Sequence, residues 1–168
     1  TKDYNKDILK RLHWIDSLHG KSTTYPNSTH TTQLIVGAND ENDREILQRM
    51  EKIYNRTQLK RTYFSAFSPI EETEFANKEA CSTDRTAKLY NADSLLNDYN
   101  SKLDELVFDK NNQLSLTQDP KILAAENMDI FPVEINTAPF VELIRVPGIG
   151  VKSARKIISI RKKGRISF

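Results

Sequence analysis

The strongest constraint on the fold is a Pro-Gly-Ile-Gly turn at residues 147–150, which separates two short amphipathic segments. Glycines permit positive φ angles, and prolines do not continue a helix, so the chain must turn here. Asn136 or Thr137 can cap a helix before the turn, with Pro139 in its first turn. The expected apolar side of that helix is Val141, Leu143, Ile144 and Val146. After the turn, residues 151–161 predict a second helix that buries Ala154, Ile157 and Ile158, with Ile160 as a further candidate for burial.

The order apolar-Pro-Gly-apolar-Gly-apolar, followed by Lys-Ser-Ala, closely resembles the helix-hairpin-helix motif of DNA repair and replication proteins. Glycines let a phosphate approach the backbone, and free N–H groups at the start of the second helix donate to its oxygens. Such contacts read the backbone, so binding is expected to be independent of sequence and strongly dependent on salt. The expected DNA-binding residues are Pro147, Gly148, Ile149, Gly150, Val151, Lys152, Ser153, Arg155 and Lys156, with Ile149 filling the gap between the helices rather than touching DNA.

Charge is segregated along the chain. The net charge is only +2, yet residues 145–168 hold eight cations and no acid. The preceding residues carry 17 cations against 23 acids, a net charge of -6. A segregated cationic segment is typical of a phosphate-binding surface, and a solvated basic tail without a partner is the alternative.

The first 70 residues predict an α/β unit. Residues 6–18 have the apolar spacing of an amphipathic helix, ended by Gly20 ahead of a loop at 20–32. Residues 33–36 form a short apolar run, expected to be a strand buried on both faces and closed by Gly37. A second strand is expected at 61–67. The helix between them, capped by Asn39 or Asp40, has the apolar face Ile46, Leu47, Met50, Ile53 and Tyr54.

Strand, helix and strand with short joints most simply form a right-handed parallel βαβ unit. Trp14 and the pair Tyr63 and Phe64 lie in these apolar patterns and are expected in the core. Residues 71–83 are polar, as in a linker or lid. Helices are expected near 84–99 and from Asp119-Pro120 to about Asn127, and residues 131–135 are expected to be extended.

Residues 31–45 resemble the late strand of radical S-adenosylmethionine enzymes, with Gly37, Glu41 and Asp43 matching the Val-Gly strand end and the acidic helix start. Together with residues 59–70, 89–99, 119–136 and the hairpin, the order is similar to the radical S-adenosylmethionine proteins of DNA modification or repair. The resemblance covers most of residues 29–168.

This resemblance implies an α/β fragment, with parallel strands of a partial TIM barrel, followed by a mostly helical region that ends in the helix-hairpin-helix. The late barrel would occupy residues 1–70, a linker and helical region 71–131, and the DNA-binding motif 132–168. It also implies a DNA partner, S-adenosylmethionine and a 4Fe-4S cluster for the full-length family protein. The adenine would lie near Gln33, Ile35, Gly37 and Glu41.

One departure bears on the chemistry. The family holds its cluster through a C-x3-C-x2-C loop, whereas this sequence has a single cysteine, Cys81. We therefore expect that the chain alone binds neither cofactor and is not catalytic. The expectation that follows is a C-terminal part of a longer protein, with the remainder of the barrel upstream. His13, His19 and His30 have no zinc-ligand spacing and predict no metal site.

Two other classes remain open. In helix-hairpin-helix base-excision glycosylases with lyase activity, a lysine at the place of Lys152 is the Schiff-base nucleophile, but no acid follows Glu142 to activate it. The other alternative is a non-catalytic module that binds DNA or protein. The sequence has no apolar run near the roughly 20 residues of a membrane span. With no signal peptide and a lone cysteine, a cytoplasmic protein without membrane contact is expected.

Overall fold

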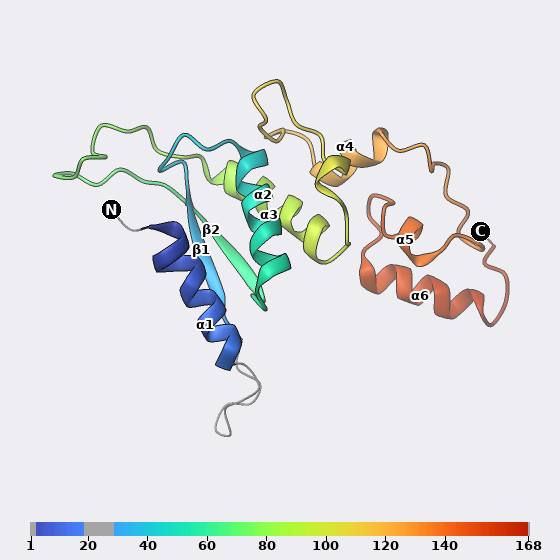
Figure 1. Ribbon diagram of the computed structural model, residues 1–168. Helices are drawn as coiled ribbons and strands as arrows, with labels where there is room; N and C mark the ends of the chain where they lie inside the picture. The colour runs from blue at the N-terminus through green and yellow to red at the C-terminus, as the bar shows by residue number, and fades with distance from the viewer. Residues whose placement is uncertain (1–2, 19–28, 168) are drawn as a thin grey trace. The chain divides into compact units, whose positions relative to one another are not determined.

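The computed structural model describes residues 3–18 and 29–167 (Figure 1). Two compact units divide the chain, residues 1–90 and 91–168, and the boundary falls within helix α3, Thr83–Asn97. Gly20 and most of the loop expected at 20–32 lie outside the described residues. The expected division into three regions, at residues 70 and 131, stays a prediction.

The first unit begins with the expected helix, as a π-helical turn η1, Tyr4–Leu9, followed by α1, Lys10–Leu18. Leu12 is the buried residue of α1. The prediction of a buried Trp14 is wrong, because its side chain is 64% exposed. Residues two apart lie on nearly opposite faces of a helix, so burial of Leu12 turns Trp14 outward.

Strands β1, Thr31–Val36, and β2, Arg61–Ala66, pair in parallel, which confirms the predicted strand-helix-strand order. The register aligns Thr31 with Arg61 and Val36 with Ala66. The prediction that β1 is buried on both faces is wrong, because Ile35 is 60% exposed while Val36 is buried. This two-stranded sheet has one covered face, and alternate side chains point to opposite faces.

Strand β2 follows the same alternation. Phe64 is buried as expected, but Tyr63 is 45% exposed, so its predicted place in the core is wrong. The covered face meets α3 through Tyr90, whose ring packs edge-on against Phe64 at 5.1 Å. The Tyr90 hydroxyl also accepts from the Phe64 N–H at 2.8 Å and donates to the Phe64 carbonyl. These bonds satisfy backbone groups of β2 that a further strand would otherwise pair.

Helix α2, Asp43–Arg56, joins the strands and buries Ile46, Leu47, Met50 and Ile53, as expected. Its cap is Asn42, not Asn39 or Asp40. The Asn42 side chain accepts from the Glu45 N–H at 2.9 Å, and the Glu45 carboxylate accepts from the Asn42 N–H at 3.0 Å. This reciprocal pair satisfies two backbone donors, which a single cap further upstream does not.

Residues 71–82, in the first unit, contain no helix or strand, and a linker or lid at 71–83 stays a prediction.

The regular elements described in the second unit, residues 91–168, are helices. A 3-10 turn η2, Leu103–Glu105, is followed by α4, Pro120–Glu126, which Asp119 caps as its sequence predicts. Helices α5, Phe140–Leu143, and α6, Val151–Arg161, complete the unit. Among the described residues, no helix is long and apolar enough to cross a membrane.

Candidate nucleic-acid interface

Helices α5 and α6 pack around a small apolar cluster of Ala138, Leu143, Ile144 and Ala154. Ile149, from the turn, packs against this cluster, as expected for a residue that fills the gap between the helices. Val141 is 57% exposed and Ile160 is 46% exposed, so the predicted places of these two side chains on the apolar sides of their helices are wrong. Helix α5 is only four residues long, and its apolar contacts come from its last turn and the residue that follows.

The start of α5 also differs from the prediction. Its N-cap is Pro139, and no side chain caps it, so neither Asn136 nor Thr137 has that role. The Asn136 side chain instead accepts from the Ile166 N–H at 2.8 Å and donates to the Ile166 carbonyl at 3.0 Å. Asn136 is thus committed to a tertiary contact with the C-terminal residues.

The hairpin turn leaves backbone donors at the start of α6. Gly148 has φ +82°, the left-handed conformation expected of a glycine here, and the Ile149 N–H closes the turn on the Val146 carbonyl at 3.0 Å. Gly150 has an ordinary φ of -91° and caps α6 without a side chain. The Ala154 N–H makes the first bond of the helix, to the Gly150 carbonyl at 2.9 Å. The N–H groups of residues 151–153 therefore have no acceptor within the helix and point out of its N-terminus.

In a comparison with protein families, the family model described as a helix-hairpin-helix motif matches residues 130–167. Residues 130–167 form a helix-hairpin-helix motif. No curated protein and no solved structure matches the chain. The match covers the motif alone, so the resemblance of residues 29–168 to radical S-adenosylmethionine proteins stays a prediction.

The cations of the motif divide into two groups. Arg145 and Arg161 hold the fold. The Arg145 guanidinium donates to the Tyr99 carbonyl at 3.0 Å and pairs with Glu105 at 2.9 Å, while Arg161 donates to the Ala138 carbonyl at 2.7 Å. The sequence cannot separate these two from the rest, because their acceptors lie 23 to 46 residues away. The other six cations of residues 145–168 are exposed, namely Lys152, Arg155, Lys156, Lys162, Lys163 and Arg165.

A residue outside the match, Lys121 of α4, also reaches the hairpin. Its Nζ donates to the Ile149 carbonyl at 2.7 Å and lies 4.5 Å from the centre of the Tyr99 ring. Burial lowers the pKa of Lys121, the nearby charge of Arg145 lowers it further, and Asp119 opposes the shift. No sequence pattern links positions 121 and 149, so sequence reasoning missed this contact.

The residues expected near a cofactor lie at the first unit's sheet. Gln33 and Ile35 are on its exposed face, where the Gln33 amide donates to the Ser65 hydroxyl. Gly37 closes β1 with φ +87°, and a Cβ there would lie 2.6 Å from the Cβ of Cys81. The Glu41 carboxylate pairs with Arg49.

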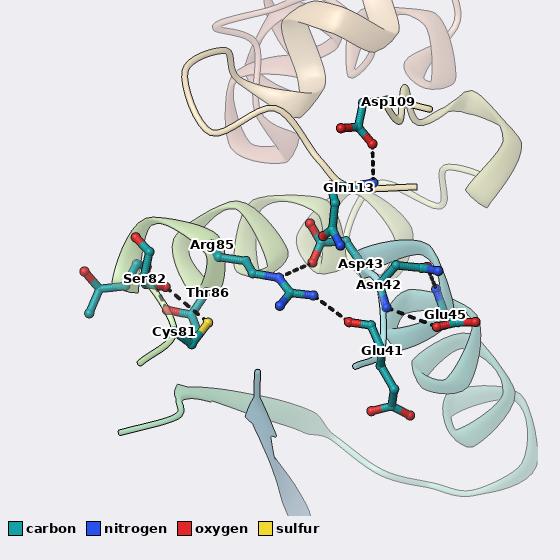
Figure 2. A network of polar contacts seen from close by, with 11 residues as sticks. Glu41, Asn42, Asp43, Glu45, Cys81, Ser82, Arg85, Thr86, Asp109 and Gln113 are labelled. Atoms are coloured by element: carbon teal, nitrogen blue, oxygen red, sulfur yellow. Dashed lines mark hydrogen bonds and ion pairs between the residues drawn. The ribbon is translucent and has the colours of Figure 1, made fainter. Parts of the chain in front are cut away.

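Figure 2 shows the polar network that follows this strand end. Arg85 donates through Nε to the Asp43 carboxylate at 2.7 Å and through a terminal nitrogen to the Glu41 carbonyl at 2.7 Å. Asp43 is 1% exposed, so this is a buried ion pair between α2 and α3. The two side chains bond each other across α2 and α3, so the pair has a structural role.

Within the described part of the chain, the metal-ligating residue types do not form a cluster. Among residues 3–18 and 29–167, no group of three or more His, Cys, Asp and Glu side chains could hold a metal ion. His30 lies 3.4 Å from Asp16, and His19 is outside the described residues. A 4Fe-4S cluster does not fit the single cysteine of this chain, because such clusters are held by several cysteine thiolates.

Proposed function

We propose that this chain binds the phosphate backbone of DNA, independently of base sequence, through residues 147–153 with Arg155 and Lys156. The observation that carries the proposal is the open N-terminus of α6 beside Gly148, set among exposed cations. Backbone N–H groups and the helix dipole favour a phosphate oxygen at this place. Neither group contacts a base edge, so the interaction carries no sequence readout.

Fluorescence anisotropy with two duplexes of unrelated sequence, at several salt concentrations, tests the proposal. The expected result is one affinity for both duplexes and a linear fall of log K with log salt, about 0.9 per phosphate contact. Binding that ignores salt, or no binding, would contradict it. Either outcome would favour a module that docks protein.

A lyase activity is the enzymatic alternative. Lys152 is exposed at the start of α6, but the last acid of the sequence is Glu142, ten positions before it. An acid that follows the lysine and activates it is absent from this sequence, so Lys152 is better suited to a phosphate contact than to a nucleophilic role. Borohydride trapping on DNA with an abasic site should therefore give no adduct, and an adduct at Lys152 would favour the lyase.

We also propose that the α/β unit derives from a radical S-adenosylmethionine barrel that modifies or repairs DNA. The parallel pairing of β1 with β2 and the left-handed Gly37 at the strand end support this proposal. In such a protein Gln33, Ile35, Gly37 and Glu41 would lie beside the adenine of S-adenosylmethionine, and the cluster ligands would come from elsewhere. The reading frame upstream of Thr1 tests it: a three-cysteine loop would support the proposal, and a frame without one would contradict it.

A further inference from the structure

The backbone of Lys121 is held by the cap of α4, and its side chain extends from there to the hairpin. Asp119 caps α4 by accepting from the Lys121 N–H at 2.8 Å. The centre of the Tyr99 ring lies 4.5 Å from the ammonium, and the backbone that carries this ring is held because the Tyr99 carbonyl accepts from Arg145 at 3.0 Å. Lys121 therefore extends from a capped helix over an aromatic ring, and both contacts favour the bond to Ile149.

The Lys121 ammonium lies at a pocket that the hairpin turn helps to form. A pocket of about 460 Å³ is lined by Tyr99, Asp119, Lys121, Ile122 and residues 147–150. The Tyr99 hydroxyl would lie 3.3 Å from a Cβ placed on Gly150. Lys121 is partly buried at this pocket, and burial is the main cause that lowers its pKa.

The bond from Lys121 fixes the direction of a second group. The Ile149 carbonyl and the Gly150 N–H belong to one planar trans peptide, in which the two groups point in opposite directions. With the carbonyl held toward Lys121 at 2.7 Å, the Gly150 N–H must point away from Lys121. A peptide next to glycine rotates easily, so without this bond the carbonyl oxygen is free to turn toward the phosphate side and repel the ligand.

We infer that Lys121 is a positioning residue for phosphate binding, which orients the peptide between Ile149 and Gly150 so that its N–H faces the DNA backbone. The inference rests on the proposed function of the hairpin. It extends the DNA-binding element beyond residues 130–167, to α4 and Tyr99. Lys121 acts through the hairpin peptide and makes no contact with phosphate.

The test uses the full chain and two lysine variants in the same anisotropy assay. Lys121→Met keeps the length of the side chain and removes the charge. We expect it to weaken binding about tenfold at every salt concentration, as for loss of one charge-assisted hydrogen bond, with the salt slope unchanged. Lys152→Met, the matched control, removes a direct phosphate contact and should reduce the slope by about 0.9. Lys121→Arg keeps a donor and should restore most of the affinity.

A second readout follows the peptide itself. In the wild-type protein the amide resonance of Gly150 should shift when a duplex is added, and this shift should disappear in Lys121→Met. Circular dichroism and thermal unfolding check that the variant is folded, and the exposed Lys110→Met checks the general effect of removing a cation.

The outcomes separate the two proposals. Absence of salt-dependent binding by the wild-type chain would contradict the proposed function itself. If the wild-type protein binds and Lys121→Met binds equally well, the positioning role is wrong while the hairpin remains the DNA-binding site. A reduced salt slope in Lys121→Met would also overturn it, because it would make Lys121 a direct phosphate contact.

Discussion

Glu134, in the segment that leads to α5, accepts two hydrogen bonds from Asn136. The backbone N–H of Asn136 donates to its carboxylate at 2.9 Å and the side-chain amide at 3.2 Å. The backbone bond is the main reason that the pKa of Glu134 lies below its ordinary value of 4.5. Since Asn136 also bonds Ile166, this carboxylate helps to fix the residues after α6.

The first prediction concerns this carboxylate. A carbon-detected NMR titration should place the pKa of Glu134 below 4.5. Asn136→Ala removes the side-chain bond and keeps the larger backbone contribution, so it should raise the pKa of Glu134 only part of the way toward 4.5. Because the folded pKa is the lower one, the bonds stabilise the fold above the unfolded pKa, and the effect is lost as the pH falls through the folded pKa. An unchanged pKa in Asn136→Ala would show that the side-chain amide of Asn136 does not contribute to the shift.

The second prediction separates the two glycines of the turn. Gly148→Ala meets no atom within 4 Å, so its cost comes from φ +82° alone, about 1 kcal/mol of unfolding free energy. Gly150→Val has an allowed φ but crowds Tyr99 and the phosphate approach. It should weaken binding equally on every DNA sequence. Urea unfolding and anisotropy measure the two effects, and a sequence-selective loss would contradict backbone readout.

At the scale of elements, the ion pair of Asp43 and Arg85 links the first turn of α2 to α3. The pair is buried on the Asp43 side, with a further bond from Arg85 to the Glu41 carbonyl. No periodicity in the sequence marks it, because the partners are 42 positions apart.

The third prediction follows from that burial. Arg85→Met leaves the Asp43 carboxylate without its cation and should lower the unfolding free energy by roughly 3 kcal/mol. The double variant Arg85→Met with Asp43→Asn removes the charge as well and should recover part of that loss. Urea unfolding gives both values. A single variant as stable as the wild-type protein would show that the pair does not hold the two helices together.

At the scale of the whole molecule, the net charge of +2 does not indicate where the charged side chains are concentrated. Residues 145–168 hold all their charge as cations, but tertiary contacts withdraw Arg145 and Arg161 from the surface. Counterion release depends on the cations that meet phosphate, not on the total.

The fourth prediction uses this division. Arg155→Met and Lys156→Met should each lower the salt slope of DNA binding by up to about 0.9 and leave stability nearly unchanged. Arg145→Met should have the opposite effects. It removes the bonds to Tyr99 and Glu105, so it should lower the melting temperature and leave the salt slope unchanged. Equal effects of all three on the slope would contradict the division into structural and exposed cations.

The sequence by itself determined the hairpin, the bounds of α6, the parallel strand order and the buried face of α2. These follow from local preferences: glycine at a positive φ, apolar spacing along a helix, and short joints between strands. Only the tertiary structure decided which face of the sheet is covered, and with it the exposure of Ile35 and Tyr63. It alone decided that Arg145 holds the fold and that Lys121 reaches Ile149. The reason is physical: a side chain's role depends on partners that are distant in sequence, and no local pattern records them.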